Sequence, residues 1–222
     1  MTSSVSDAQG GAPRRLRSDD GRLVRGRRSR ARILRAAREL FRERGFDGAT
    51  LRAIAERAGM GASSIYRHVR SKEELLVSEL AVLQEEAWKR FRASDDRRAP
   101  TAARVERFLR LQHELLAADR DFTLIALRAT TRPQARVARQ VLALHDRTIG
   151  LLAEILQIGR MRGDLARDLD VLEAARTLFH ITQGARIPWV NGLVDDDACL
   201  DAIRRDVELL VRGIGAQRPA QA

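Results

Sequence analysis

The segment that most constrains the fold is residues 50–76, TLRAIAERAGMGASSIYRHVRSKEELL. Thr50 is a favourable N-cap residue, and the apolar residues behind it recur at helical spacing, which predicts a short helix. These apolar residues are Leu51, Ile54, Ala55 and Ala58. Gly59 then permits a sharp turn, because glycine enters the left-handed conformation without the steric penalty of a Cβ atom.

A second short helix is expected after this turn, and it has two different faces. Its buried face should hold Ala62, Ile65 and Val69, and its opposite face should present Ser63, Ser64 and Arg67. Two short helices that cross closely over a small residue, here Ala55, form a helix-turn-helix. Such a unit places its second helix in the major groove of DNA.

The charge distribution favours the same interpretation. The chain carries a formal charge of +11. Residues 1–72 contain 18 basic and 7 acidic residues and so hold all of it, whereas residues 73–222 contain 23 of each. A basic field confined to one region is typical of a nucleic-acid interface. A membrane-surface role would also require lipid-facing aromatic residues beside the arginines, so no membrane partner is predicted.

Length and composition set the remaining limits. With 222 residues the chain can form one large or two modest domains. No apolar run approaches the roughly 18 residues of a membrane-spanning helix, and the polar N-terminus lacks a secretory signal. Cys199 is the single cysteine, which excludes an intrachain disulfide and suits a reducing compartment. A cytoplasmic location is therefore expected.

We predict an all-α fold organised in four segments. Residues 1–27 are Arg-rich without hydrophobic periodicity and are predicted to be a disordered arm, either inert or trailing along DNA phosphates. Residues 28–76 are predicted to form the DNA-binding domain, with a first helix over 28–44 that Gly45 ends. Residues 77–215 should form a helical domain, followed by a flexible tail over 216–222.

The helices of the second domain are predicted from caps, periodicity and breakers. Ser71 and Glu74 form a capping box that starts a long helix ending at the SDDRRAP stretch, residues 94–100. Further helices are expected at about 101–118, 121–129, 133–160, 170–187 and 196–213. Gly163 and Pro188 are the expected breakers after the third and fourth of these.

With these residues laid out, the chain resembles the tetracycline-repressor (TetR) family of bacterial transcription regulators. The resemblance rests on residues 33–76, where the Ile65–Tyr66 pair, His68 and the Lys72–Glu73 pair fall at the family's spacing. Val69 stands in place of the more usual phenylalanine, and Gly61 in place of the usual Ser or Thr. The resemblance implies a homodimer that binds a palindromic double-stranded DNA operator and releases it when a small molecule enters the C-terminal domain.

The resemblance also assigns DNA-binding roles by position. Thr50 resembles a backbone contact and Arg52 a base contact of the first helix. The base-reading face would consist of Ser63, Ser64 and Arg67. Tyr66, His68 and Lys72 resemble phosphate anchors.

A mainly apolar effector is expected in the helical domain. Its candidate contacts are Trp88, Phe91, Phe108, Phe122 and Phe179, with His145 and Gln183 as polar anchors. A plain core is an equally good interpretation of each aromatic residue alone. His113, His145 and His180 lack the close spacing of a helical metal-ligand motif, so no metal or cofactor is predicted.

Dimerisation is expected through the last two helices, since the segment 171–187 is apolar over a very wide arc. Candidate interface residues are Leu178, Ala185, Ile203, Val207 and Leu210. The sequence contains no nucleophile-elbow, P-loop or dinucleotide motif, and no enzyme activity is predicted. A ligand-responsive repressor is the leading hypothesis. A DNA-binding activator or architectural protein without an effector remains the alternative.

Overall fold

The computed structural model describes residues 18–131 and 133–215, with side chains described from residue 24 onward and not at Thr131. Within these ranges the chain is helical, and it contains no β-strand beyond one isolated bridge between Leu165 and Gly215. The all-α prediction is confirmed. The helices are α1 Ser18–Gly48, α2 Leu51–Arg57, α3 Ala62–Ile65, α4 Lys72–Ser94, α5 Thr101–Ala117, α6 Arg120–Thr131, α7 Ala135–Arg162, α8 Val171–Val190 and α9 Asp196–Gly213.

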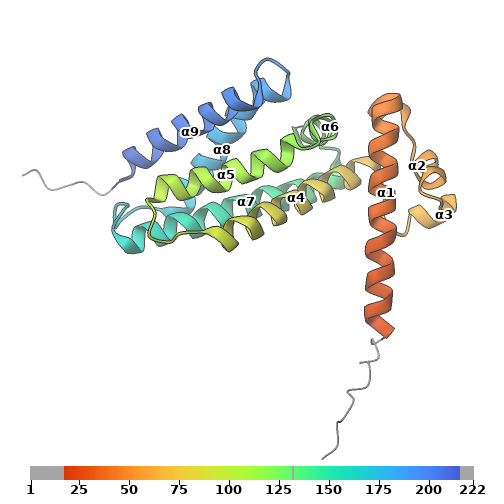
Figure 1. The fold of residues 1–222 in the computed structure, drawn as a ribbon, viewed down its shortest axis with the longest axis horizontal. Helices are drawn as coiled ribbons and strands as arrows, with labels where there is room; N and C mark the ends of the chain where they lie inside the picture. Colours follow the sequence, from red (N-terminus) through yellow and green to blue (C-terminus); the bar gives the residue numbers. More distant parts are fainter. Residues whose placement is uncertain (1–17, 132, 216–222) are drawn as a thin grey trace, which may run out of the picture.

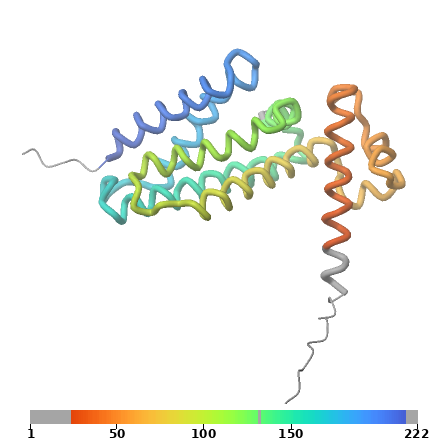
Figure 2. The backbone as a smooth tube through the Cα atoms, in the orientation of Figure 1, coloured from red at the N-terminus to blue at the C-terminus, as the bar shows by residue number. Residues whose placement is uncertain are grey.

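The helices form two parts that share one core (Figure 1). α1 stands across one end of an elongated bundle made by α4 to α9, and α2 and α3 pack on the side of α1 that faces away from the bundle. The smooth trace shows α4 running from the α2–α3 unit into the bundle (Figure 2). The buried apolar residues form one continuous cluster, from Ile33 of α1 to Val207 of α9.

Three sequence predictions about helix boundaries and burial are wrong. α1 begins at Ser18, so residues 18–27 of the predicted disordered arm are helical, while residues 1–17 lie outside the described part. Pro188 lies inside α8, in its last turn, where the missing N–H removes only one helical bond. Ala62 is exposed, because it is the first residue of a four-residue helix.

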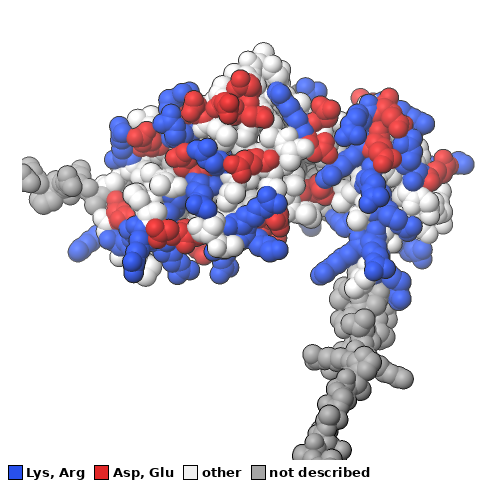
Figure 3. Space-filling model, viewed as in Figure 1, with Lys and Arg blue, Asp and Glu red and all other residues white. Residues whose placement is uncertain are grey.

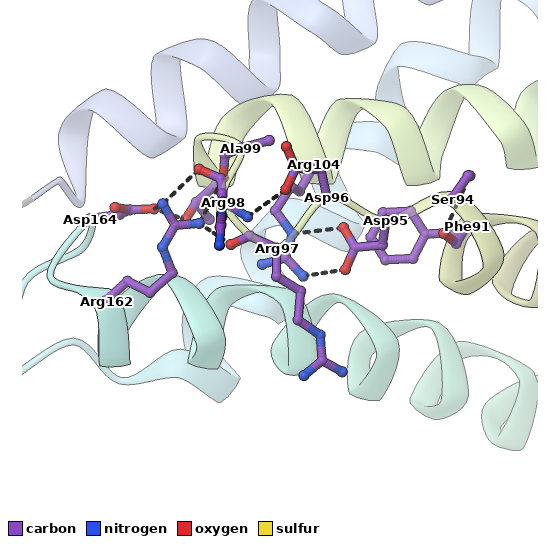
Figure 4. Close-up of polar contacts among 11 residues, drawn as sticks. Phe91, Ser94, Asp95, Asp96, Arg97, Arg98, Ala99, Arg104, Arg162 and Asp164 are labelled. Carbon is purple, nitrogen blue, oxygen red and sulfur yellow. Dashed lines mark hydrogen bonds and ion pairs between the residues drawn. The ribbon is translucent and has the colours of Figure 1, made fainter.

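The predicted break at 94–100 is present, and polar contacts fix it to the bundle (Figure 4). The buried Arg104 of α5 makes a bidentate ion pair with Asp95, at 2.8 and 2.7 Å. Arg162 at the end of α7 donates hydrogen bonds to the carbonyls of Arg97, Arg98 and Ala99. The connection between α4 and α5 is therefore tied to α5 through the Asp95 side chain and to α7 through its backbone carbonyls.

α5 and α7 approach each other closely at a glycine, Gly159 of α7. A Cβ atom on Gly159 would lie 2.2 Å from Oγ1 of Thr101 and 2.9 Å from its Cγ2. Thr101 cannot simply rotate away, because its hydroxyl donates a 2.9 Å hydrogen bond to Asp164. Close packing at this end of the bundle thus requires glycine at position 159.

This requirement predicts opposite effects for two glycines of α7. Gly159→Ala should lower the free energy of unfolding by about 1–3 kcal/mol, the usual cost of overpacking. Gly150→Ala should raise it by about 0.5–1 kcal/mol, because Gly150 is exposed with open space around its Cβ position and alanine favours the helix. Urea denaturation of the two variants measures both effects. Equal effects of the two substitutions would contradict the close approach.

α5, α8 and α9 meet around the buried His113. Its ring packs edge-on against Trp189, with 4.8 Å between ring centroids, and Nδ1 lies 3.9 Å from Sγ of Cys199. Burial, assisted by the positive charge of Arg186, lowers the pKa of His113 to about 4, although Asp196 opposes the shift. His113 is therefore neutral in the folded protein at neutral pH.

The pKa of His113 is lowered from 6.5 to about 4 in the folded protein. Between these two pH values the unfolded chain therefore binds a proton at His113 that the folded protein does not bind. The stabilisation is complete above pH 6.5 and is lost as the pH falls toward 4, by about 3 kcal/mol in total. The His113→Gln variant has no group that titrates at this position, so its unfolding free energy should fall less on acidification. The difference in unfolding free energy between parent and variant should therefore shrink as the pH falls. Chemical denaturation at pH 7, 5.5 and 4.5 tests this. Parallel losses in the two proteins would contradict it, since His145 titrates in both.

Candidate nucleic-acid interface and bundle cavity

The α2–turn–α3 unit has the geometry that the sequence predicts. Thr50 is the N-cap of α2, and its hydroxyl accepts a hydrogen bond from the amide of Ala53 at 3.1 Å. Gly59 adopts the left-handed conformation, with φ of 64°. The turn closes with a 2.9 Å hydrogen bond from the amide of Met60 to the carbonyl of Ala55. Ala55 and Ile65 are fully buried, so α2 and α3 cross over a small residue.

α3 and the residues that follow it, up to Val69, have one buried side and one exposed side. Ile65 and Val69 are buried, whereas Ser63 and Arg67 are exposed and Ser64 is half-buried. The guanidinium of Arg67 donates a 3.0 Å hydrogen bond to the Ser64 hydroxyl, which holds the two polar groups together. The structure thus brings the predicted base-reading residues onto one accessible surface.

The flanking candidates differ in how available they are. Tyr66 is 59% exposed, and His68 is half-buried. Arg52 lies on the exposed side of α2, where its Nε donates to Glu56 at 3.2 Å. A surface pair of this kind contributes little to stability and leaves the arginine free to exchange partners.

Lys72, a predicted phosphate anchor, also has an internal role. Its ammonium group donates a hydrogen bond to the carbonyl of Phe46 and lies 4.4 Å from the centroid of the Phe46 ring. The side chain is half-buried at the start of α4. Lys72 therefore connects α4 to the end of α1, a contact that its spacing in the sequence did not indicate.

The described surface has the predicted charge asymmetry. Figure 3 shows Lys and Arg side chains gathered on the lower part of α1, whereas acidic and basic side chains are mixed at its upper end and over the bundle. The N-terminal half of α1 presents the exposed arginines Arg25, Arg27, Arg28, Arg32 and Arg35. α2 packs on α1 and α3 packs on α2, so the arginines of α1 and the exposed residues of α3 belong to the same part of the molecule (Figure 1).

A cavity of about 520 Å³ lies between α6, α7 and α8. It is open to solvent on the side where the exposed residues Arg128, Gly184, Ile187 and Asn191 line it. Its size lies within the usual range of small-molecule sites. The residues that line it are Leu127, Arg128, Thr130, His145, Gln183, Gly184, Arg186, Ile187, Val190 and Asn191. A smaller cavity of about 50 Å³ continues toward α4 and α5 and shares Arg186 with the larger one.

Two of the seven predicted ligand contacts, His145 and Gln183, line this cavity. Trp88, Phe91 and Phe108 do not, because they stack on one another in the core, with centroid separations of 5.2–5.7 Å. Phe179 is buried against His145 but does not reach the cavity surface. The aromatic residues are therefore mainly core, since mutual packing buries their surface more completely than a cavity wall does.

Phe122 lies elsewhere, between α6 and α1. Its ring stacks on Phe41 of α1, with 6.1 Å between centroids. Asp119 lies just before α6, and its carboxylate oxygens are 3.4 Å from Nε of Arg38 and 3.8 Å from Nη2 of Arg42, both in α1. α6 thus contacts the DNA-binding unit at one end and lines the cavity at the other, a connection that sequence reasoning missed.

Arg186 is a buried, charged cavity residue that sequence reasoning missed. It is 4% exposed and donates one hydrogen bond, of 2.8 Å, to the side chain of Gln112. The signal was available, because Arg186 lies in a helix segment that is otherwise apolar over a wide arc. Long charged side chains are almost never fully buried without a partner.

Three of the predicted dimer contacts are wrong. Leu178, Ile203 and Val207 are buried in the chain's own core, because the apolar stripes of α8 and α9 pack on each other and on α5 and α7. Ala185 and Leu210 are half-buried. The exposed apolar residues of the two helices are instead Leu172, Ile187 and Leu209.

Within residues 18–131 and 133–215, no group of three or more His, Cys, Asp or Glu side chains is arranged to hold a metal ion. None of the helices described here has the length and apolarity needed to cross a membrane.

Comparisons with known proteins agree with this geometry. Residues 33–78 match the family described as "Bacterial regulatory proteins, tetR family". The HTH-type transcriptional repressor KstR of Rhodococcus jostii is 30% identical over 98% of this chain and 99% of its own length. The HTH-type transcriptional regulator UidR of Escherichia coli is 29% identical over 70% of this chain and 79% of its own.

A solved structure shows the same architecture. Thermus thermophilus FadR, a TetR-family transcriptional repressor crystallised with lauroyl-CoA, superposes with a TM-score of 0.72 at 25% identity. The match covers 87% of this chain and 99% of that protein. With a helix-turn-helix at its N-terminus, a helical domain behind it and a full-length repressor relative, the chain belongs to the TetR family of bacterial transcriptional regulators.

Proposed function

We propose that the protein is a ligand-responsive transcriptional repressor that binds palindromic operator DNA as a homodimer. A small, mainly apolar effector in the α6–α7–α8 cavity would release it from the DNA. The observation that carries this proposal is the position of α6, which lines the cavity and contacts α1 through Phe122 and Asp119. The repressor relative and the lauroyl-CoA complex of the solved relative support it.

DNA reading is assigned to the exposed side of α3. Arg67 is the one side chain of the predicted base-reading face that can donate two hydrogen bonds to a guanine edge. Ser63 and Ser64 supply shorter polar contacts beside it, and Arg52 reaches bases from α2. Thr50, Tyr66, His68 and Lys72 are proposed to contact the sugar–phosphate backbone, which sets orientation and affinity rather than sequence.

Replacing Arg67 and Tyr66 should separate these two roles. Arg67→Ala should relax the preference at one position of each half-site, with a loss of about 1–3 kcal/mol of discrimination against the wrong base. Tyr66→Phe removes only an exposed hydroxyl and should weaken binding to every sequence alike. Binding-site selection followed by titration at several salt concentrations measures both effects. A changed consensus for Tyr66→Phe and an unchanged one for Arg67→Ala would reverse the assignment.

Effector control is proposed to act through α6 and α4 together. A ligand that favours one position of the α6 segment at Leu127 and Thr130 would displace its other end, where Phe122 and Asp119 meet α1. α4 would transmit the same displacement to Phe46 through Lys72. The ligand can weaken operator binding only by its own preference for the DNA-free conformation, commonly about 1–3 kcal/mol.

This regulation is testable without knowing the effector in advance. Compounds that raise the melting temperature of the protein in a thermal-shift screen are then added to the protein–operator complex. We expect at least one of them to release the operator. If none does, the alternative of a DNA-binding protein without an effector is favoured.

The outer faces of α8 and α9 are proposed as the dimer interface. Leu172 of α8 and Leu209 of α9 are exposed apolar residues that do not line the cavity. Two helices from each subunit would form a four-helix bundle about a two-fold axis. The two α3 segments could then reach half-sites about 34–36 Å apart.

Leu209→Glu tests this interface without entering the core, because Leu209 is 75% exposed in the single chain. A charge buried without a partner at a subunit interface is strongly destabilising, so the variant should be monomeric at micromolar concentration while remaining helical. Leu142→Glu on α7, at a position that is 60% exposed, is the matched control and should remain dimeric. Analytical ultracentrifugation distinguishes the two. A dimeric Leu209→Glu variant would place the interface elsewhere.

A further inference from the structure

Arg186 lies in the interior without a counter-ion. Its side chain is 4% exposed, and within the described residues its hydrogen-bond partner is the uncharged Gln112, with no Asp or Glu at ion-pair distance. One guanidinium nitrogen, Nη2, donates to Gln112, and the buried Nε has no hydrogen-bond partner. Most of the donor capacity of this guanidinium is therefore unused by the protein itself.

A buried cation without a partner is costly for the folded chain. Removing a charge from water costs several kcal/mol unless an opposite charge and hydrogen bonds replace the lost hydration. Burial lowers the pKa of Arg186 to about 10, which still leaves the group charged at neutral pH. The fold retains a positive charge in a place where hydrophobic packing alone would favour an apolar side chain of similar length.

The surroundings of Arg186 select the sign of a ligand. Arg128 is the second charged residue among the described residues that line the cavity, and no Asp or Glu is present there. His145 is not a competing cation at neutral pH, because burial lowers its pKa. The remaining wall includes the apolar side chains Leu127, Ile187 and Val190.

Arg186 also stands at the junction of the two cavities. It lines both the cavity of about 520 Å³ and the inner one of about 50 Å³, together with Leu127, Thr130, His145 and Gln183. A ligand that fills the larger cavity therefore passes beside the guanidinium. The inner cavity is too small for more than a few atoms, so the bulk of a ligand must lie on the outer side.

We propose that the effector is an amphipathic organic anion whose carboxylate or phosphate group pairs with Arg186 while its apolar part lies against Leu127, Ile187 and Val190. This inference rests on the proposed function and specifies the chemical class of its ligand. Charge-assisted hydrogen bonds from a planar guanidinium to a carboxylate or phosphate are among the strongest in proteins. The ligand would supply the counter-ion that the described residues do not provide.

The test compares three probes of equal chain length, dodecanoate, dodecyl phosphate and the neutral dodecanol. The parent should bind one or both anions more tightly than dodecanol, as measured by isothermal titration calorimetry and by the rise in melting temperature. Arg186→Met should weaken binding of that anion by about 10- to 100-fold and leave the affinity for dodecanol nearly unchanged. Arg186→Lys, which keeps the charge, should recover part of the affinity.

The ligand-free melting temperature separates a ligand role from a structural one. Arg186→Met should be as stable as the parent or more stable, because it removes an uncompensated buried charge. Arg176→Met on the exposed side of α8, where Arg176 pairs with Glu173 at 3.5 Å, is the matched control and should bind all three probes like the parent. A less stable Arg186→Met protein that still binds the anions at parental affinity would overturn the inference.

Two other outcomes separate this inference from the proposed function. If dodecanol releases the operator as well as the anions do, in the parent and in Arg186→Met alike, effector control stands and the anionic class is wrong. If the anions bind in an Arg186-dependent manner but leave the operator bound, the proposed anion site is supported and its proposed role in releasing DNA is contradicted. Tighter binding of dodecyl phosphate than of dodecanoate, or the reverse, identifies which acidic group the site prefers.

Discussion

The continuity of the hydrophobic core is the constraint on which the rest of the structure depends. Buried side chains pass without interruption from Ile33 and Ile54 in the DNA-binding unit to Phe91 and Val207 in the bundle. A domain joined by a flexible linker could be reoriented freely, but a shared core resists small displacements and transmits them. The position of the α2–α3 unit relative to the bundle is therefore set by packing in the shared core.

Arginine serves opposite purposes in the two parts of this protein. At the surface of α1 and α3, each solvated arginine interacts only weakly with a phosphate group. Together these arginines produce an electrostatic field that attracts phosphate. At the α4–α5 connection, Arg104 is buried but paired with Asp95, so its charge is compensated and fixes a loop. Arg186 is buried and has no carboxylate partner within the described residues. Burial and partners together, rather than residue type, determine what each guanidinium does.

Most of the fold could be predicted from the sequence, because caps, glycines and apolar spacing act locally. The predicted helix caps and turns are present, with Thr50 and Ser71 as N-caps and Gly59 and Gly163 in the left-handed conformation. The predictions that were wrong concerned which element covers an apolar helix face. The stripe containing Leu178 was correctly apolar, but spacing cannot tell whether such a stripe packs on its own chain or on a second copy. Pro188 failed as a breaker because its effect depends on its place in the helix.

The candidate cavity was predictable only in part for the same reason. His145 and Gln183 were expected as polar anchors, and both reach the cavity surface. The aromatic residues Trp88, Phe91 and Phe108 were equally consistent with a core, and mutual stacking determined the outcome. Which side chains surround an empty space depends on three-dimensional packing among helices distant in sequence, and periodicity carries no information about it.

The preponderance of arginine over lysine has a consequence for how the DNA-binding charge can be altered. Residues 1–72 contain 17 Arg and one Lys, and the whole chain has only two lysines, Lys72 and Lys89. Guanidinium groups in water keep their proton at any pH that a cell reaches, whereas acetylation removes charge only from amines. The attraction to phosphate is therefore nearly fixed by covalent structure, and ionic strength remains the main variable that tunes it.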